Sequence, residues 1–317
     1  MRVSVIIPAK NEEHYLGKCL HALECAKKKW GGAVEVILVD NGSSDATVEI
    51  ARAYECQIVE APDEKIGGLR NLGADKSQGE ILGFLDADCV VDEHWFCYCL
   101  QRFNDERIGA VGTRAVPSFQ NATWVEKAWF NLVSGAPRPD FVEWLGTSNL
   151  FVKKELFFEV GGFDVSLRAG EDVALSRCIG KTKKICLEKR IHTIHLRESK
   201  TLSELLKREC YRGQDSLKSL LKNNFDPREV PSTLVPLINL LAMSFVIPVI
   251  LMGEFKIVLL LILLIISLPL IFMIKKRARI SNILEWFQCY VIAFVYIFAR
   301  SCSVVYEVWK SLIMFFS

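Results

Sequence analysis

The chain has 317 residues, of which 51% are hydrophobic and 24% charged, with a formal net charge of +2 and a mean hydropathy of +0.24. The apolar content and the modest glycine and proline counts exclude a disordered or collagen-like chain. Charge is unevenly distributed, because residues 234–317 hold seven basic and three acidic side chains, which leaves residues 1–233 at a net −2. A soluble part without a basic excess argues against a nucleic-acid partner.

The first 90 residues alternate between strand and helix patterns. Continuous apolar runs predict buried strands at residues 3–7, 34–39, 57–60 and 81–85. Helical spacing of apolar residues and turn residues at the starts predict helices at residues 11–25, 47–54 and 67–76. This alternation predicts a parallel sheet with right-handed crossovers, and so an α/β fold with a mostly parallel central sheet.

Beyond residue 105 the pattern is looser but still mixed. Strands are expected at residues 109–113 and 146–152, and helices at residues 124–133, 153–160, 172–179 and 202–221. The apolar run at the N-terminus is only five residues long, which does not match a signal peptide. Eleven cysteines without a C-x-x-C pair indicate small buried side chains in a reducing compartment rather than a disulfide or zinc framework.

The C-terminal part carries two long apolar segments. Residues 234–252 and 257–274 are uncharged over 19 and 18 residues, and each is about long enough to cross a hydrocarbon core of roughly 30 Å. Only four residues separate them, so they predict a tight helical hairpin. Basic residues flank the hairpin on both outer sides, which puts those flanks in the cytoplasm and the turn outside.

A third apolar stretch, residues 286–306, contains Arg300. It either spans the membrane with an embedded arginine or lies along the interface. The chain is therefore expected to comprise a cytoplasmic domain of residues 1–230 and a membrane domain of residues 231–317 with two or three apolar helices. This organisation predicts a multi-pass protein of the cytoplasmic membrane.

Acidic residues follow the expected strand ends. Asp40, Asp86 and Asp88 come directly after two of the buried runs. Since ligands of such sheets bind at the carboxyl ends of the strands, the three side chains should converge on one crevice. Asp86 and Asp88 can jointly hold a divalent cation, which would neutralise a diphosphate leaving group. The competing interpretation is a solvated turn.

Other candidate residues carry two interpretations each. One carboxylate of Glu171 and Asp172 can take a proton from an acceptor hydroxyl, although acids are also favoured at a helix N-terminus by its dipole. Arg70, after two glycines, can meet a pyrophosphate or a base carbonyl. Those glycines match neither the dinucleotide-binding fingerprint nor a P-loop. His195 is a metal ligand or an ordinary structural histidine, and its pairing with His192 has no third ligand at metalloprotease spacing.

Taken together, these pieces resemble the family 2 glycosyltransferases, the inverting class with the GT-A fold. The resemblance covers about residues 3–215, in unbroken order. It is carried by Val5-Ile-Ile-Pro-Ala-Lys-Asn-Glu12, Val39-Asp-Asn-Gly-Ser-Ser-Asp45, Gly67-Gly-Leu-Arg-Asn-Leu-Gly73, Leu85-Asp-Ala-Asp88, Gly161-Gly-Phe-Asp164, Gly170-Glu-Asp172 and Tyr211-Arg-Gly213. One departure is Lys10, where relatives often have an aromatic residue, so the base is not inferred from it.

The resemblance implies a role for each matching position. Donor binding falls to the loop residues and the strand ends: Pro8, Ala9, Asn11, Glu12, Asp40, Arg70, Asp86 and Ala87. Asp88 would be the principal metal ligand, aided by Asp86 and His195, and the metal is Mn²⁺ or Mg²⁺. Asp172 would be the general base, with Glu171 supporting it.

The implied activity is transfer of a sugar from a nucleotide-diphosphate donor, UDP-linked, to a hydroxyl of a glycan or lipid-linked acceptor such as a cell-envelope polysaccharide. Two alternatives stay open. A polyprenyl-phosphate glycosyltransferase has an anionic acceptor and needs no general base. A non-catalytic sugar-nucleotide-binding membrane protein would lose an acidic metal ligand, whereas Asp86 and Asp88 are both present here.

Overall fold

The structure, a computed structural model, describes residues 1–133, 139–167, 169–214, 230–276, 278 and 280–316. Contacts divide the chain into two compact units. Unit 1 comprises Met1–Ser118 and Arg138–Arg197, and unit 2 comprises Phe119–Pro137 and Glu198–Ser317. This division by contacts differs from the expected boundary at residue 230 between a cytoplasmic and a membrane domain. That boundary stays a prediction.

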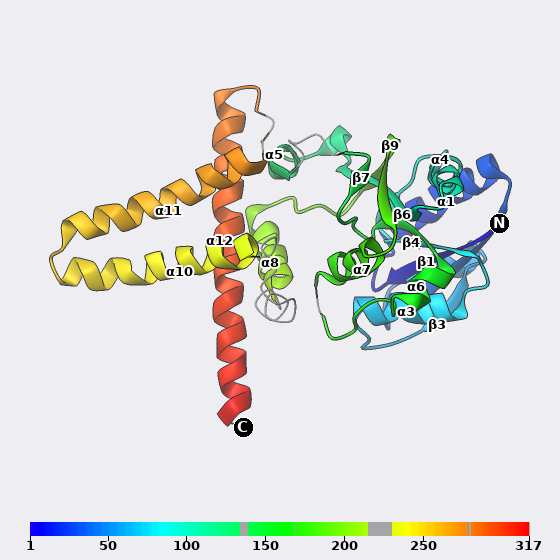
Figure 1. The fold of residues 1–317 in the computed structure, drawn as a ribbon, viewed down its shortest axis with the longest axis horizontal. Coiled ribbons are helices and arrows are strands. Elements are labelled where there is room, and N and C mark those ends of the chain that lie inside the picture. Colours follow the sequence, from blue (N-terminus) through cyan, green and yellow to red (C-terminus); the bar gives the residue numbers. More distant parts are fainter. Residues whose placement is uncertain (134–138, 168, 215–229, 277, 279, 317) are drawn as a thin grey trace. The chain divides into compact units, whose positions relative to one another are not determined.

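Unit 1 is built on one sheet with the strand order β3-β2-β1-β4-β8-β6-β9-β5, and β7 pairs with β9 (Figure 1). The strands are β1 (Arg2–Ala9), β2 (Ala33–Asp40), β3 (Gln57–Glu60), β4 (Ile81–Leu85), β5 (Cys89–Val90), β6 (Ile108–Pro117), β7 (Phe141–Val142), β8 (Asn149–Lys153) and β9 (Lys184–His195). The four expected N-terminal strands pair in parallel. β8 runs antiparallel to both β4 and β6, so the sheet is mixed.

Helices cover both faces of this sheet. They are α1 (Leu16–Trp30), α2 (Thr47–Ala53), α3 (Ile66–Lys76), α4 (Trp95–Gln101), α6 (Lys154–Glu159) and α7 (Glu171–Gly180). Successive side chains of a strand point to opposite faces. Accordingly Val5 and Ile7 pack into a core with α1 and α4, whereas Ile6 packs into a second core with α3, α6 and α7. Both faces of the sheet are covered by apolar side chains, so a polar ligand is expected at the carboxyl ends of the strands.

One predicted helix begins later than expected. The pattern placed its start at residue 11, but α1 begins at Leu16. Asn11 adopts a positive φ of 55°, and its side-chain oxygen accepts from the backbone N–H of Ser44 at 2.8 Å. Its own N–H donates to Ser43 Oγ at 3.0 Å. The residues after β1 therefore form a connection to the loop after β2 instead of a first helical turn.

Unit 2 consists of helices in the described residues. They are α5 (Trp124–Val133), α8 (Leu202–Gly213), α10 (Val230–Leu251), α11 (Phe255–Lys276) and α12 (Ile283–Phe316). The end expected for α8 at residue 221 lies outside the described residues. α5 has the expected bounds. α12 packs against the other four helices.

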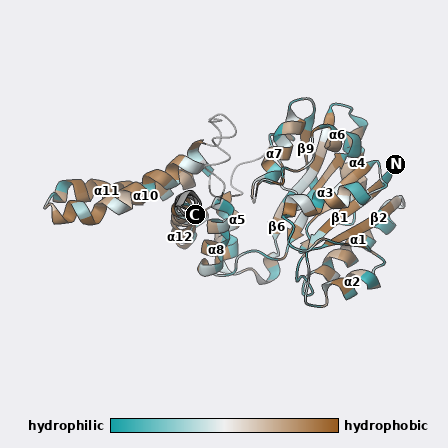
Figure 2. Cartoon of the chain, turned by 90° about the horizontal axis from the view of Figure 1, so that it is seen from below, coloured by the Kyte–Doolittle hydropathy of each residue, from teal (hydrophilic) through white to brown (hydrophobic). Residues whose placement is uncertain are grey.

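Three of these helices are long and apolar enough to cross a membrane: Thr233–Leu251, Phe255–Lys276 and Ile283–Tyr306. The hydropathy colouring shows α10 and α11 as hydrophobic over most of their length (Figure 2). They form the expected hairpin, whose turn contains Gly253 at a φ of 76°. The third stretch belongs to one continuous helix, α12.

Arg300 in α12 is paired with a buried acid. Its Nη2 lies 3.0 Å from Glu209 Oε2 on α8, and its Nη1 donates to the carbonyl of Arg212 at 2.9 Å. The Glu209 side chain is 1% exposed. Charged residues in apolar helices are stable when they are paired in this way. A Cβ at Gly213 would collide with the Ser303 side chain, so glycine permits this close approach of α8 to α12.

Candidate active site

A cavity of about 340 Å³ opens at the carboxyl ends of β1, β2 and β4 in unit 1. Seven of the expected site residues line it: Pro8, Ala9, Glu12, Arg70, Asp86, Ala87 and Asp88. Lys10, Asn41, Glu64, Ile66 and Leu69 complete the lining. The carboxylates that follow the β4 strand thus face the same hollow as the loop after β1. The strand ends predict that Asp86 and Asp88 share a crevice with Asp40, and the family resemblance adds the loop after β1; of these residues, Asp40 is not in the lining of the cavity.

Asp40 ends β2, and its neighbour Asn41 lines the cavity. Asp40 Oδ2 accepts from the backbone N–H groups of Gly42 and Ser43, both at 3.0 Å. Its Oδ1 is buried and has no hydrogen-bond partner among the described residues. One carboxylate oxygen therefore fixes the turn, and the other keeps its capacity to accept a hydrogen bond.

Arg70 links three elements around the cavity. From α3, its Nη2 lies 2.8 Å from Asp86 Oδ1 after β4, and its Nη1 lies 2.8 Å from Glu171 Oε1 on α7. The Arg70 side chain is 4% exposed. Burial alone would lower the pKa of Arg70, but the two carboxylates outweigh it and raise the pKa. The guanidinium is therefore charged and committed to positioning two acids.

The neighbouring acids Glu171 and Asp172 lie in different surroundings at the start of α7. Gly170, with a φ of 82°, turns the chain into the helix. Glu171 is buried against Arg70, whereas Asp172 is half-buried and its Oδ1 accepts from the N–H of Val173 at 2.8 Å. Asp172 Oδ2 lies 3.8 Å from the position a Cβ would take on Gly146. Neither acid lines the cavity itself.

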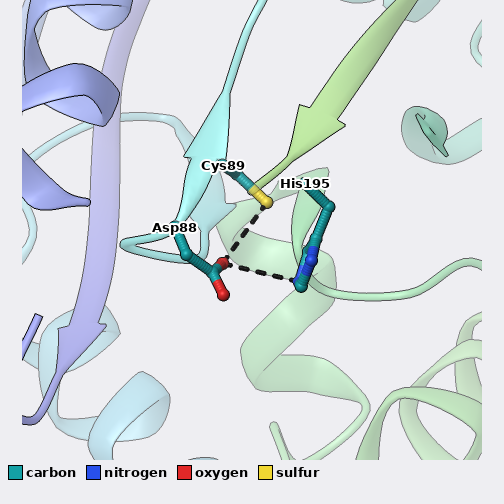
Figure 3. Close-up of side chains that lie close together, drawn as sticks. All are labelled: Asp88, Cys89 and His195. Carbon is teal, nitrogen blue, oxygen red and sulfur yellow. Dashed lines mark hydrogen bonds and ion pairs between the residues drawn. The ribbon is translucent and has the colours of Figure 1, made fainter. Parts of the chain in front are cut away.

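Asp88 and His195 meet where β5 pairs with β9 (Figure 3). His195 Nε2 lies 3.5 Å from Asp88 Oδ1. The backbone N–H of Leu196 donates to the carbonyl of Asp88 at 2.9 Å, which fixes the strand end beside the carboxylate. Burial raises the pKa of Asp88, and the Asp86 charge raises it further, while His195 and Arg197 oppose the increase. His192, three positions along the strand, is exposed, so the two histidines do not form a pair.

The Asp88 and His195 pair fits a divalent cation. Ligand atoms of Asp88, Cys89 and His195 all lie within 4.8 Å of one another. Carboxylate oxygens suit Mg²⁺ and Mn²⁺, and imidazole is a common ligand of transition metals. Burial and the neighbouring carboxylates raise the pKa of the Cys89 thiol well above its usual value. The thiol therefore stays protonated and points its sulfur at Asp88 Oδ1 from 3.8 Å.

Glu12 is paired with a residue that the sequence did not indicate. Its Oε1 lies 2.7 Å from Arg197 Nη1, and its Oε2 is buried without a hydrogen-bond partner in the described part of the chain. Burial raises the pKa of Glu12 to about 7; Arg197 opposes this, and Asp88 and Asp86 add to it. The only signal for Arg197 in the sequence is a basic residue two positions beyond His195.

Comparison with known proteins identifies the class as the glycosyltransferases, and the fold and this acidic cavity agree with that class. The sequence model of glycosyl transferase family 2 matches residues 4–166, about half of the chain. The chain belongs to this family.

Curated relatives match parts of the chain. Glycosyltransferase AglE of Haloferax volcanii is 33% identical over 182 residues, which cover 54% of this chain and 59% of AglE. The undecaprenyl-phosphate 4-deoxy-4-formamido-L-arabinose transferase of Pseudomonas paraeruginosa is 36% identical over 93 residues, 27% of each chain. The chain thus matches less than two thirds of the length of these relatives.

Among solved structures, the mannosyltransferase PcManGT from Pyrobaculum calidifontis, in complex with GDP-Man and Mn²⁺, aligns with a TM-score of 0.64. The alignment covers 98% of this chain and 87% of PcManGT at 16% sequence identity. The two proteins therefore share a fold.

Proposed function

We propose that this chain is a membrane-bound inverting glycosyltransferase. It moves a sugar from a nucleotide-diphosphate donor to a hydroxyl group of a glycan or lipid-linked acceptor. The observation that carries the proposal is the Asp88 and His195 pair, set beside the cavity that Asp86 and Arg70 line in a family 2 glycosyltransferase.

The donor would lie in the cavity with its nucleoside along the loops after β1 and β2. Asp40 Oδ1, buried and unpartnered among the described residues, would accept from a base N–H. Pro8, Ala9 and Ala87 line the same hollow, and Asn11 holds the two loops together. A nucleotide sugar with Mn²⁺ is bound by PcManGT, which has this fold. The resemblance implies UDP as the nucleotide, and GDP is the alternative because PcManGT binds GDP-Man.

In the reaction, an acceptor oxygen forms a bond to the anomeric carbon while the bond from that carbon to the diphosphate breaks. Asp172 takes the proton of the acceptor hydroxyl. Glu171, held by Arg70, keeps the first turn of α7 in place. A divalent cation, Mn²⁺ or Mg²⁺, held by Asp88, Asp86 and His195, would supply positive charge to the departing diphosphate.

The role of Asp172 is tested by replacing it with asparagine. The variant Asp172→Asn should bind the donor normally but transfer sugar roughly 100-fold more slowly, the scale of general-base catalysis. The matched control is Asp75→Asn on α3, an exposed acid that does not line the cavity. Normal turnover in Asp172→Asn would remove this residue from the role of base.

A phosphate acceptor is the second candidate. A relative from Pseudomonas paraeruginosa carries undecaprenyl phosphate in its name, undecaprenyl-phosphate 4-deoxy-4-formamido-L-arabinose transferase. Such an acceptor is already anionic and needs no base, so Asp172→Asn would then retain its rate. Following radiolabelled sugar into a lipid phosphate or into a hydroxyl-linked product separates the two acceptors directly.

We further propose that α10, α11 and α12 span the cytoplasmic membrane and that unit 1 faces the cytoplasm. Basic residues before α10 and after α11 support this orientation. A cysteine introduced in the α10–α11 turn, Glu254→Cys, should react with an impermeant maleimide on intact cells. Cys25, exposed on α1, should react only after lysis. Equal labelling of both sites on intact cells would contradict the orientation.

A further inference from the structure

Arg197 is a cation beside the cavity that has no role in the scheme above. It follows β9, two positions after His195, and the hydrogen bond from Leu196 to Asp88 fixes the backbone there. Its side chain is 57% exposed, and Nη1 lies 2.7 Å from Glu12 Oε1. A guanidinium is thus held next to the expected cation site by a carboxylate 185 positions earlier in the chain.

The cations that line the cavity already have partners. Arg70 is bound to two carboxylates through Nη1 and Nη2, and Lys10 Nζ makes one hydrogen bond, to Asn41 Oδ1 at 3.2 Å. A donor diphosphate brings phosphate oxygens into a hollow whose lining includes Glu12, Glu64, Asp86 and Asp88. These oxygens accept hydrogen bonds, and cationic donors beside the cavity would offset the negative charge of its lining. Arg197 contacts a single carboxylate oxygen and is more than half exposed, so it can turn toward a ligand.

We propose that Arg197 is a diphosphate-binding residue that exchanges Glu12 for the β-phosphate of the donor. This inference rests on the proposed function, because it assigns a contact to the same donor. Guanidinium forms two parallel hydrogen bonds with phosphate, whereas here it forms one with Glu12. In this pair the Arg197 side chain is 57% exposed and that of Glu12 14%, so the exchange leaves a largely buried carboxylate, and two bonds to phosphate must outweigh the single bond to Glu12.

A fixed ion pair is the competing interpretation. In that case Arg197 and Glu12 would only hold the end of β9 against the loop after β1. The two interpretations differ in what removal of Glu12 does. An exchanging arginine is released by Glu12→Gln and stays able to bind phosphate, whereas a fixed pair is broken equally by Glu12→Gln and by Arg197→Ala.

The test measures how well the full chain in detergent distinguishes a diphosphate from a monophosphate. Calorimetry with Mn²⁺ gives dissociation constants for UDP and UMP and for GDP and GMP, and the base that binds more tightly is used. Arg197→Ala should lower the ratio of monophosphate to diphosphate dissociation constants by about tenfold or more, the loss of one charged hydrogen bond. Arg197→Lys should restore part of it, and Glu12→Gln should leave the ratio equal or higher.

The matched control is Arg107→Ala, which removes an arginine that is 69% exposed and paired with Asp105. A folding defect would weaken monophosphate and diphosphate alike and leave the ratio unchanged. A wild-type ratio in Arg197→Ala overturns the inference, as does an equal fall of the ratio in Arg197→Ala and Glu12→Gln. If the wild-type chain binds neither diphosphate, the proposed function fails together with the inference.

Discussion

Each unit contains a buried cluster of paired arginine and carboxylate side chains, but acids outnumber arginines in one cluster and arginines outnumber acids in the other. In unit 1, Arg70 pairs with two acids, Asp86 and Glu171. In unit 2, Glu209 lies within ion-pair distance of three arginines, Arg208, Arg212 and Arg300, and Arg208 also pairs with Glu198. The first arrangement leaves an excess of negative charge next to a cavity, which suits a cation. The second leaves an excess of positive charge around an apolar helix, which suits a structural link between α8 and α12.

This comparison is tested most strongly by removing Arg70. Arg70→Leu leaves two carboxylates without their partner, and breaking a buried pair costs about 3–5 kcal/mol. The free energy of unfolding should fall by about that amount, as measured by denaturation in detergent. Arg70→Lys should recover only part of it, because an ammonium cannot bridge two carboxylates with a planar fork. A loss no larger than that of an exposed arginine would contradict the bridging role.

The matching change in unit 2 should be milder. Arg300→Leu leaves Glu209 with Arg208 and Arg212, so the acid is still compensated. The loss in the free energy of unfolding should be about 1–2 kcal/mol, near the centre of single-mutation effects. Denaturation under the same detergent conditions as for Arg70→Leu makes the two losses comparable. If Arg300→Leu were the more damaging, the proportions of charge in the two units would not explain their stability.

The pH dependence of the free energy of unfolding tests the acidic cluster beside the cavity in unit 1. Glu12 has its pKa raised to about 7 by burial, with nearby Asp88 and Asp86 adding to the effect. Between the unfolded pKa of a glutamate and pH 7 the folded chain binds more protons than the unfolded one, so Glu12 lowers stability as pH rises through this window.

The variant Glu12→Gln removes that dependence. Its stability relative to the wild type should increase from pH 5 to pH 8 by on the order of 1–3 kcal/mol, with EDTA present. Thermal unfolding of both chains over this range gives the difference. A constant difference across the range would show that Glu12 does not titrate there.

Local sequence patterns predicted much of unit 1. The β-branched runs predicted β1 to β4, and acids at the strand ends indicated that Asp40, Asp86 and Asp88 converge on one crevice, a cavity that Asp86 and Asp88 line. Long-range pairing could not be predicted, because side chains 101 and 185 positions apart have no local periodicity to relate them. The Arg70 to Glu171 and Glu12 to Arg197 contacts are of this kind. The same holds for β8, which inserts antiparallel between β4 and β6.

One helix start, that of α1, was missed because side chains at its expected start form other hydrogen bonds. Asn11 uses its amide and backbone to hold Ser43 and Ser44, so the apolar stripe begins to form a helix only at Leu16. In unit 2 the lengths of the apolar segments correctly predicted helices. The ion-pair partner of Arg300 could not be predicted, because Glu209 lies in another helix.

The central claim is that Asp88 and its neighbours bind a divalent cation together with a nucleotide diphosphate. Calorimetric titration of UDP and GDP into the full chain, with and without Mn²⁺, tests it most directly. We expect Mn²⁺-dependent binding in the wild type and in Asp75→Asn, and a loss of affinity of about tenfold or more in Asp88→Asn. Equal affinity of Asp88→Asn and the wild type, or binding that is indifferent to Mn²⁺, would contradict it.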